Sequence, residues 1–325
     1  MASFLASYGI GLYPLKTNIA DKIWGRLKPA RPKEPLEKVE ETFAGKSCCD
    51  KIQDVRKEMN SSQVDNLVIT ALDEIAWLLN IRGQDIPFNP VFFSFLIISQ
   101  NTVQLYLDTD RPHSREVLDQ LNRSMDEPVI VSPYEQFYED IRSLGSKLYD
   151  STSGRTKGTV SLDPASCNVS VFGELPATSV VENTSPVKLR KSVKTKEEID
   201  GMKQAHIRDG KALLKFFAWL DSEIRSVQDD AATLSKSSER PSVEIEKELC
   251  TERSLTEYDV AEKLESFRRA EPGFKSLSFS TISSSGANGA IIHYKPTRSN
   301  CSIIDPRSVY LCDSGGQYAD GTTDV

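Results

Sequence analysis

The most informative segment of this chain reads Tyr310-Leu311-Cys312-Asp313-Ser314-Gly315-Gly316-Gln317-Tyr318-Ala319-Asp320-Gly321-Thr322-Thr323-Asp324-Val325. The apolar residues before Asp313 predict a buried strand, and the Gly-Gly and Asp-Gly pairs after it are typical of turns. We therefore expect a β-hairpin with an aspartate at each end. Carboxylate oxygens are the ligands that Mn²⁺, Mg²⁺ and Ca²⁺ prefer, so the hairpin is a candidate metal site.

Two registers of this hairpin are possible. A turn at Asp320-Gly321 would separate Asp313 from Asp324 by four residues along the strand, roughly 13 Å. A loop centred between Tyr318 and Ala319 places the two aspartates directly opposite each other, with Cβ atoms about 4.5–5.5 Å apart. The second register suits a shared metal cluster, and we favour it. The spacing alone fits equally well a surface hairpin whose two aspartates are solvated.

The hairpin segment closely resembles the first metal-ligand motif of Xaa-Pro aminopeptidases (aminopeptidase P), which are pita-bread metallopeptidases related to prolidase, creatinase and methionine aminopeptidase. Three further stretches, in order along most of the chain, resemble the same family. They are Leu72-Asp73-Glu74-Ile75-Ala76-Trp77-Leu78-Leu79-Asn80 with Arg82-Gly83, Ala205-His206-Ile207-Arg208-Asp209, and Thr281-Ile282-Ser283-Ser284 with Ile291-Ile292-His293-Tyr294.

The resemblance implies roles for three residues. Asp313 and Asp324 correspond to metal ligands of a site that holds two Mn²⁺ ions, and no other cofactor is expected. From its context alone, a lone histidine such as His293 in a strand-like segment is more typical of a structural group. The resemblance instead implies that His293 faces the metal site, holds the substrate and moves protons at the scissile bond, which suits a group that titrates near neutral pH.

The ligand set is expected to be incomplete. In the family, a histidine and two glutamates that complete the site correspond to positions after Val325, and nearly all of the first domain is also missing, so we expect a chain truncated at both ends and inactive by itself. Nothing in their context supports Glu257 or Glu271 as substitutes. We interpret His206 as structural, and His113, which follows Pro112 at a helix start, as exposed.

The fold class expected is α/β, in three parts. Residues 1–45 are a linker and remnant of a first domain, 46–186 a creatinase-like α/β domain, and 187–325 the N-terminal half of a pita-bread (α+β) domain. The prolines at 29, 32 and 35 predict an extended linker. In the middle part we predict strands at 67–69, 75–79, 91–98 and 103–107, helices at 47–59, 114–126 and 134–149, and a loop at 151–160.

In the last part, Thr195 and Glu198 form a capping box that predicts a helix start, and apolar residues from Ile199 to Ile224 recur at helical spacing. Residues 227–254 are polar and weakly patterned, which indicates an exposed insertion. Thr256 with Asp259 predicts a second helix, and strands are expected at 277–282, 290–294 and 308–312.

Composition excludes several classes of protein. The 325 residues carry a net charge of −7 without a basic cluster, so neither nucleic acid nor an anionic membrane is an expected partner. No apolar run approaches the ~20 residues of a membrane span, and the N-terminus lacks the basic region of a signal peptide. Six cysteines without Cys-x-x-Cys spacing indicate reduced thiols and a cytoplasmic location.

The predicted function is therefore metal-dependent cleavage of the N-terminal Xaa-Pro bond of peptides with proline in second position, with a homodimer expected for the complete enzyme. A prolidase-like dipeptidase is one alternative, although the motifs resemble aminopeptidase P more closely. A non-enzymatic pita-bread interaction module is another, although such proteins usually lose the metal aspartates. A third is a truncated regulatory partner that dimerises with a complete enzyme.

Overall fold

The computed structural model describes residues 2–11, 15, 18–112, 114–123, 125–150, 155–238, 240–253 and 255–325. The chain separates into two units, Met1–Pro32 and Lys33–Val325. The first unit contains α1 (Ala2–Ser7), α2 (Ile19–Trp24) and the 3-10 helix η1 (Gly25–Leu27). The Asn18 side chain caps α2 by accepting from the Ala20 amide. Residues 28–36 contain no helix or strand, as the prolines predict.

A six-stranded mixed sheet organises the first part of the second unit. Its strand order is β10-β9-β2-β4-β5-β6, in which β2–β4 and β4–β5 pair antiparallel and the other three pairs are parallel. The strands are β2 (Asn66–Ile69), β4 (Ser94–Ser99), β5 (Val103–Leu107), β6 (Ile130–Ser132), β9 (Val160–Leu162) and β10 (Val180–Glu182). The strands predicted at 67–69 and 103–107 are confirmed, and the one predicted at 91–98 begins at Ser94.

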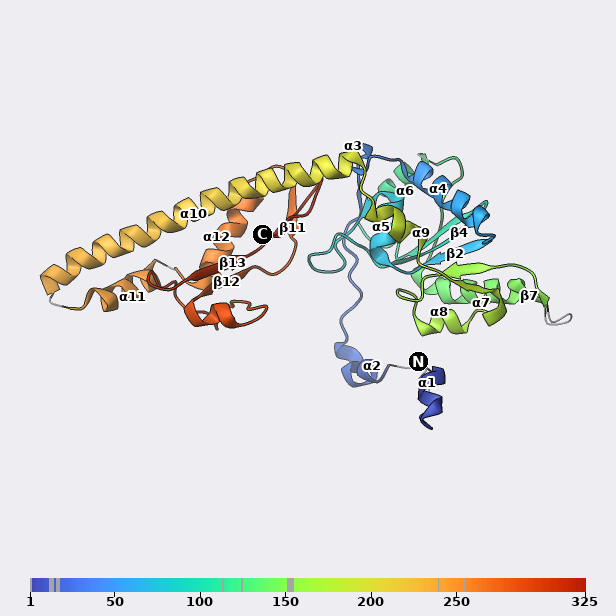
Figure 1. Ribbon diagram of the computed structural model, residues 1–325, viewed down its shortest axis with the longest axis horizontal. Helices are drawn as coiled ribbons and strands as arrows, with labels where there is room; N and C mark the ends of the chain where they lie inside the picture. The colour runs from blue at the N-terminus through green and yellow to red at the C-terminus, as the bar shows by residue number, and fades with distance from the viewer. Residues whose placement is uncertain are drawn as a thin grey trace. The chain divides into compact units, whose positions relative to one another are not determined.

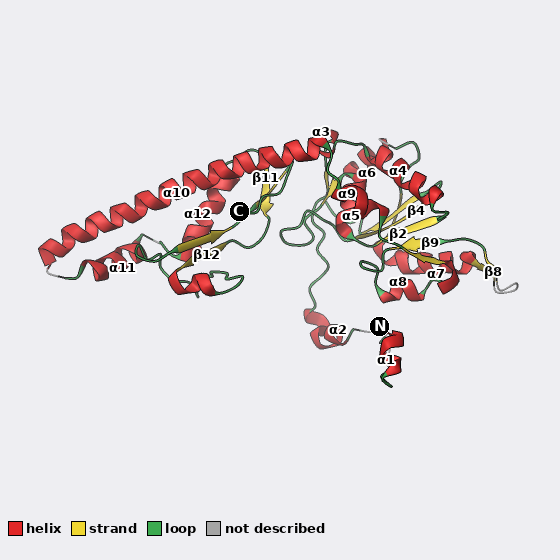
Figure 2. Ribbon diagram, viewed as in Figure 1, coloured by secondary structure: helices red, strands yellow, loops and turns green. Residues whose placement is uncertain are grey.

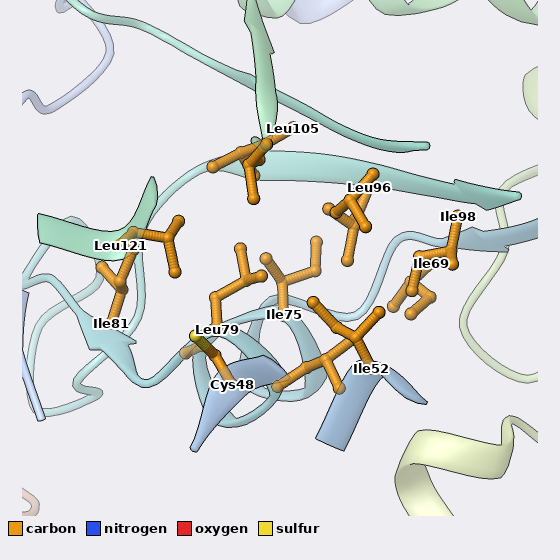
Figure 3. Packing of buried hydrophobic residues seen from close by; sticks show 14 of the residues in the cluster. Cys48, Ile52, Ile69, Ile75, Leu79, Ile81, Leu96, Ile98, Leu105 and Leu121 are labelled. Atoms are coloured by element: carbon orange, nitrogen blue, oxygen red, sulfur yellow. The ribbon is translucent and has the colours of Figure 1, made fainter. Parts of the chain in front are cut away.

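Helices cover both faces of this sheet (Figure 1). The α4, α5 and α6 helices pack on one face, and α7 and α8 pack on the other. Side chains alternate along β4, so that Leu96 and Ile98 face the first group and Phe95 and Ile97 the second. Figure 3 shows the first group, with Ile52 of α4 and Ile75 of α5 beneath the strands. The helices are α4 (Cys48–Ser61), α5 (Leu72–Leu79), α6 (Ser114–Arg123), α7 (Phe137–Leu148) and α8 (Val169–Gly173).

The strand predicted at 75–79 is wrong, because these residues form the C-terminal part of α5. The helix carries Asp73 and Glu74 in its first turn, where carboxylates favour the helix dipole. It ends at Asn80, which adopts a left-handed conformation (φ 53°) and donates its amide to the Ala76 carbonyl. The α5 helix packs in one core with the sheet and α4, which buries Ile75, Ala76, Leu78 and Leu79, and such an apolar run has the same composition as a buried strand.

Shorter elements complete this part of the unit. Two small antiparallel pairs join β1 to β3 and β7 to β8. The predicted loop at 151–160 contains β8 and the start of β9, and its residues 151–154 lie outside the described residues. The remaining elements are β1 (Glu37–Lys38), α3 (Glu41–Ala44), β3 (Ile81–Arg82), η2 (Tyr134–Gln136), β7 (Tyr149–Asp150), β8 (Arg155–Thr156), η3 (Ala177–Ser179) and α9 (Pro186–Ser192).

Three helices dominate the last part of the chain (Figure 2). They are α10 (Lys196–Ser238), α11 (Ser242–Glu252) and α12 (Glu257–Arg269). The helix starts predicted at Thr195 and Thr256 are confirmed, and Thr195 with Glu198 forms the predicted capping box. Glu198 accepts from the Thr195 amide while Thr195 accepts from the Glu198 amide, and Thr256 accepts from the Asp259 amide.

Most of the residues that the structure describes within 227–254, predicted to be an exposed insertion, are exposed, and they are helical. The α10 helix continues to Ser238, and α11 packs against it so that Val227, Ile245 and Cys250 are buried. The apolar stripe from 199 to 224 is buried only in part, since Phe216 is inaccessible whereas Ile199 is exposed.

Two antiparallel strand pairs follow the helices: β11 (Phe274–Leu277) with β14 (Gly316–Tyr318), and β12 (Ile282–Ser285) with β13 (Tyr310–Asp313). The single strand predicted at 277–282 is therefore wrong, because β11 ends at Leu277 and β12 begins at Ile282. The strand predicted at 290–294 is also wrong, since the 3-10 helix η4 (Gly286–Ala290) leads into a turn. The strand predicted at 308–312 is confirmed as β13.

The α/β fold class is confirmed. Within the described residues, no helix is both long enough and apolar enough to cross a membrane. All six cysteines are free. The domain boundary near Pro186 stays a prediction.

Candidate metal centre

The segment that carries the two aspartates is a hairpin with one consistent register. Ser314 and Val325 exchange two backbone hydrogen bonds of 2.9 and 3.0 Å. The Thr323 amide donates to the Gly316 carbonyl, and the Tyr318 amide donates to the Gly321 carbonyl. Paired residue numbers therefore sum to the same value throughout, and the turn is centred between Ala319 and Asp320.

Burial alternates along the hairpin and separates its two faces. One face is buried and consists of Ser314, Gly316, Tyr318, Gly321 and Thr323. The other face is open, with Asp313 and Gln317 half-buried and Thr322 and Asp324 exposed. Because side chains in a strand alternate between faces, Asp313 and Asp324 both lie on the open face.

The predicted direct opposition of Asp313 and Asp324 is wrong by two residues. In the observed register Asp324 lies opposite Gly315, so the two aspartates are diagonal neighbours, a relation in which Cβ atoms are typically about 7–8 Å apart. The symmetry argument placed the turn one residue too early because the turn is fixed by contacts with distant parts of the chain.

A buried ion pair anchors the closed face of the hairpin. Arg268 of α12 and Asp209 of α10 are both almost fully buried, and the guanidinium donates two hydrogen bonds to the carboxylate, of 2.7 and 3.0 Å. Arg268 also donates to the Ser314 hydroxyl at 3.0 Å, and the Tyr318 hydroxyl donates to Asp209 at 2.9 Å. Burial and the neighbouring Asp209 carboxylate raise the pKa of Tyr318, which keeps it a donor. The pair thus fixes the strand residue next to Asp313.

Contacts at the turn set the register. The Asp320 carboxylate forms an ion pair with Arg208 of α10, and Arg82 of β3 donates to the Ala319 carbonyl at 2.9 Å. Gly321 packs so closely on α10 that a Cβ there would lie 2.9 Å from the Met202 Cα. A Cβ at Gly201 would collide with the Asp320 carbonyl oxygen. The chain can therefore turn only where it does.

His293 lies in an exposed turn with φ 55°, a left-handed conformation. Its ring forms no hydrogen bond with any residue that the structure describes. The turn lies in the connection from β12 to β13, which leaves the strand pair at Ser285 and returns at Tyr310, whereas Asp313 lies at the other end of the pair, opposite Ile282. His293 is not packed in an apolar core, and its orientation toward the two aspartates stays a prediction.

The sequence analysis did not predict the role of one buried carboxylate, Glu257, which contacts the residue that follows His293. Glu257 is fully buried and accepts hydrogen bonds from the Ser285 and Ser302 amides, at 2.6 and 2.8 Å, from Asn288 at 3.0 Å to each oxygen, and from the Tyr294 hydroxyl at 2.6 Å. Burial and this contact raise the pKa of Tyr294. In the sequence, Glu257 is distinguished only by its position after the capping residue Thr256. That position indicates a helix start and does not indicate a residue that accepts several hydrogen bonds.

The structure was also compared with the predictions for Glu271, His206 and His113. Glu271 forms ion pairs with Lys211 and Lys215, which lower its pKa. His206 is exposed, with Nδ1 2.8 Å from the Met202 carbonyl oxygen. His113 lies outside the described residues.

The donor set on the open face suits a hard divalent cation in part. Neither the Asp313 carboxylate nor the Asp324 carboxylate forms a hydrogen bond or ion pair with another described residue, so all four carboxylate oxygens remain available. The part of the chain that the structure describes contains no group of three or more histidine, cysteine or acidic side chains that could hold a metal. Within the described residues, the face therefore offers two carboxylates and no third histidine, cysteine or acidic side chain.

Two family descriptions match the chain. Residues 27–198 match the creatinase/prolidase N-terminal domain, and residues 200–325 match metallopeptidase family M24. The second range contains the hairpin, α12 and all of α10 except its first four residues.

Individual relatives agree with these matches. The chain is 39% identical over 327 residues to a probable Xaa-Pro aminopeptidase P of Aspergillus niger, covering 100% of this chain and 48% of the relative. It is 40% identical over 328 residues to the protein of the same description from Aspergillus oryzae, covering 100% and 45%. The chain thus spans about half the length of the curated relatives that it matches.

Solved structures share the fold. The X-prolyl aminopeptidase of Caenorhabditis elegans, described as a cytosolic enzyme with a di-nuclear active site, superimposes with a TM-score of 0.82 at 28% identity, over 100% of this chain and 47% of that one. The X-Pro aminopeptidase of Thermotoga maritima superimposes with a TM-score of 0.52 at 18% identity, over 84% and 63%, which shows similarity of fold alone.

Proposed function

Because this chain belongs to the creatinase/prolidase N-terminal domain family and to metallopeptidase family M24, we propose that the protein is a metal-dependent Xaa-Pro aminopeptidase. It would release the N-terminal residue of peptides that carry proline in second position. The substrate class follows the relatives, which are described as Xaa-Pro aminopeptidases P.

The observation that carries the proposal is the open face of the hairpin, where Asp313 and Asp324 lie as diagonal neighbours without a protein partner among the described residues. These two carboxylates are the proposed ligands, and Mn²⁺ is the proposed metal. A divalent ion held there would polarise the scissile carbonyl and lower the pKa of a water molecule. The closed face does not touch substrate, and the Arg268–Asp209 pair keeps both carboxylates on the open face.

His293 is the proposed proton-carrying group. An imidazole can donate a hydrogen bond to the scissile carbonyl oxygen and can release that proton again. Its exposed position, without a competing hydrogen-bond partner in the described chain, leaves both ring nitrogens available to a peptide.

The rival functions are less well supported. The relatives that match over the whole chain are described as aminopeptidases, which favours that activity over a prolidase-like dipeptidase. The presence of both aspartates on one open face disfavours an interaction module that has lost metal binding. A cytoplasmic location is proposed from the free cysteines and from the description of the Caenorhabditis elegans enzyme as cytosolic. A homodimer remains part of the proposal.

The test is a peptidase assay of the protein purified from the cells that make it, on a fluorogenic Lys-Pro or Arg-Pro peptide with added Mn²⁺. We expect release of the N-terminal residue, and its loss in the Asp313→Ala variant. Asp229 of α10 is exposed and its carboxylate has no partner among the described residues, so the control variant Asp229→Asn should keep full activity. A protein that releases nothing, or whose turnover survives Asp313→Ala, would contradict the proposal.

A parallel assay uses residues 1–325 expressed alone. Two aspartates supply too few oxygens to hold two ions, so we expect no turnover from it. Turnover that disappears in Asp313→Ala would show that the two carboxylates are sufficient and that the expected inactivity is wrong.

A further inference from the structure

The segment between β12 and β13 is closed at its base by one carboxylate. Ser285, at the end of β12, donates its amide to Oε1 of Glu257, and Ser302 donates its amide to Oε2. The Glu257 amide in turn donates to the Ser302 carbonyl at 2.9 Å. Both ends of the segment 286–301 are therefore held by the side chain of Glu257.

The same carboxylate also binds the middle of that segment. The Tyr294 hydroxyl donates to Oε2 at 2.6 Å, and Asn288 donates to both oxygens and reaches the Tyr294 hydroxyl at 3.1 Å. His293 immediately precedes Tyr294 in the chain. The contact between Tyr294 and Glu257 thus restrains the conformation of the turn that contains His293.

The charge of Glu257 is stabilised without a cation. No lysine or arginine in the described part of the chain pairs with it, although it is fully buried. It lies at the first position of α12, where the positive end of the helix dipole favours a carboxylate. Every group that contacts it is a donor, so the carboxylate is satisfied entirely by hydrogen bonds from the segment that it closes.

We propose that Glu257 is a positioning residue, which holds the 286–301 segment so that His293 is presented at the open face of the hairpin. This inference rests on the proposed function for the meaning of His293, but the closure itself does not. Glu257 reaches neither substrate nor metal; it acts through Ser285, Tyr294 and Ser302.

The substitution Glu257→Gln tests the role of the second oxygen. Glutamine has the same size, but its amide nitrogen is a donor that would face another donor, the backbone amide of Ser302 or Ser285. The Tyr294 hydroxyl can reverse its hydrogen bond and a backbone amide cannot. We therefore expect Glu257→Gln to release one end of the segment and Glu257→Ala to release both ends.

Two measurements on purified residues 1–325 detect whether the segment 286–301 has been released. Hydrogen exchange of the segment 286–303 should become at least about tenfold faster in Glu257→Ala, since hydrogen bonds to a charged group are among the stronger ones. The imidazole C–H signals of His293, assigned with His293→Gln, should move toward those of a free histidine. Circular dichroism checks that each variant remains folded.

Matched variants separate closure from general destabilisation. Glu271→Gln removes a buried glutamate just beyond the other end of α12, where Lys215 pairs with it, and should leave the His293 signals unchanged. Tyr294→Phe removes the contacts of the Tyr294 hydroxyl with Glu257 and Asn288, and should shift the His293 signals while the Ser285 and Ser302 amides stay protected. Unchanged exchange and unchanged His293 signals in Glu257→Ala, Glu257→Gln and Tyr294→Phe would overturn the inference.

The outcome is distinguishable from that of the proposed function. Faster exchange with shifted His293 signals supports the positioning role even if the peptidase assay fails. Unaltered signals overturn the positioning role even if the protein cleaves Xaa-Pro peptides.

Discussion

The Arg268–Asp209 pair decides how firmly the hairpin is held. Both side chains are buried, and the pair also binds Ser314 and Tyr318. Substitution Arg268→Met leaves the Asp209 charge buried without its cation, a change that typically costs about 3–5 kcal/mol. Urea unfolding should show this loss in the free energy of unfolding.

An exposed ion pair on the same helix provides the control. Lys196 and Asp200 on α10 are both solvent-exposed, so water and salt screen their charges and the pair should contribute little to stability. If Lys196→Met destabilises the chain as much as Arg268→Met does, the special role assigned to the buried pair is wrong.

Lys51 gives the chain a pH dependence of known sign. It is buried beside the Trp77 ring, donates to the Trp77 carbonyl and to Asn80, and burial lowers its pKa from 10.5 to about 8. Between about pH 8 and 10.5 the unfolded chain binds more protons at Lys51 than the folded chain does, so stability rises with pH in this window. Below about pH 8 both states are protonated, and the full cost of the buried charge remains.

The measurement is the difference in free energy of unfolding between the parent and Lys51→Met, in which the titration of other groups cancels. One pKa unit corresponds to about 1.4 kcal/mol, so the difference should change in favour of the parent by on the order of 3 kcal/mol between pH 8 and 10.5. A difference that is independent of pH would show that Lys51 titrates normally.

At the residue scale, the sequence predicted the types of site residue better than their surroundings. The strand-turn-strand pattern was enough to identify the hairpin that carries Asp313 and Asp324, and their common face is observed. The pairing register of the two hairpin strands could not be predicted from the sequence. The residues that fix the turn, Arg208, Arg82 and Gly201, lie more than a hundred residues away along the chain. Glu257 was dismissed because its five hydrogen bonds come from residues that only the fold brings together.

The contact between α10 and the hairpin turn is the element-scale feature that sets the register. Gly201 leaves room for the Asp320 carbonyl, so Gly201→Ala should push the turn away from the helix. Overpacking of this kind typically costs about 1–3 kcal/mol. Thermal or urea unfolding should show the loss.

Gly210 on the same helix is the matched control. A Cβ there would meet nothing within 4 Å, and alanine is favoured over glycine inside a helix by up to about 1 kcal/mol. Gly210→Ala should therefore be neutral or stabilising. Equal effects of the two substitutions would contradict the close approach at Gly201.

Errors in the element predictions have a common physical origin. The α5 helix was predicted as a strand because residues 75–79 form a continuous apolar run, which periodicity alone cannot assign to a strand or to a buried helix segment. The helices within 227–254 were not predicted because α10 and α11 bury only a narrow stripe against each other, and most of their surface is polar. The helix starts at Thr195 and Thr256 were predicted reliably because their capping hydrogen bonds are local and depend on residues three positions apart.

At the scale of the whole molecule, the chain spans about half the length of the curated relatives that it matches. The described residues assemble a complete α/β layer, the α10–α12 helices and a hairpin with two available carboxylates. Whether those carboxylates act together is the claim on which the metal site, and with it the proposed activity, depends.

The most direct test is a double-mutant cycle on Mn²⁺ binding to residues 1–325, followed by the electron paramagnetic resonance signal of the free ion. If Asp313 and Asp324 hold the same ion, Asp313→Asn and Asp324→Asn should each weaken binding. The double variant should then bind little worse than either single variant, because residues that share one partner are not additive. The Asp229→Asn control should bind like the parent. Losses that simply add, or binding that neither substitution changes, would contradict the shared site.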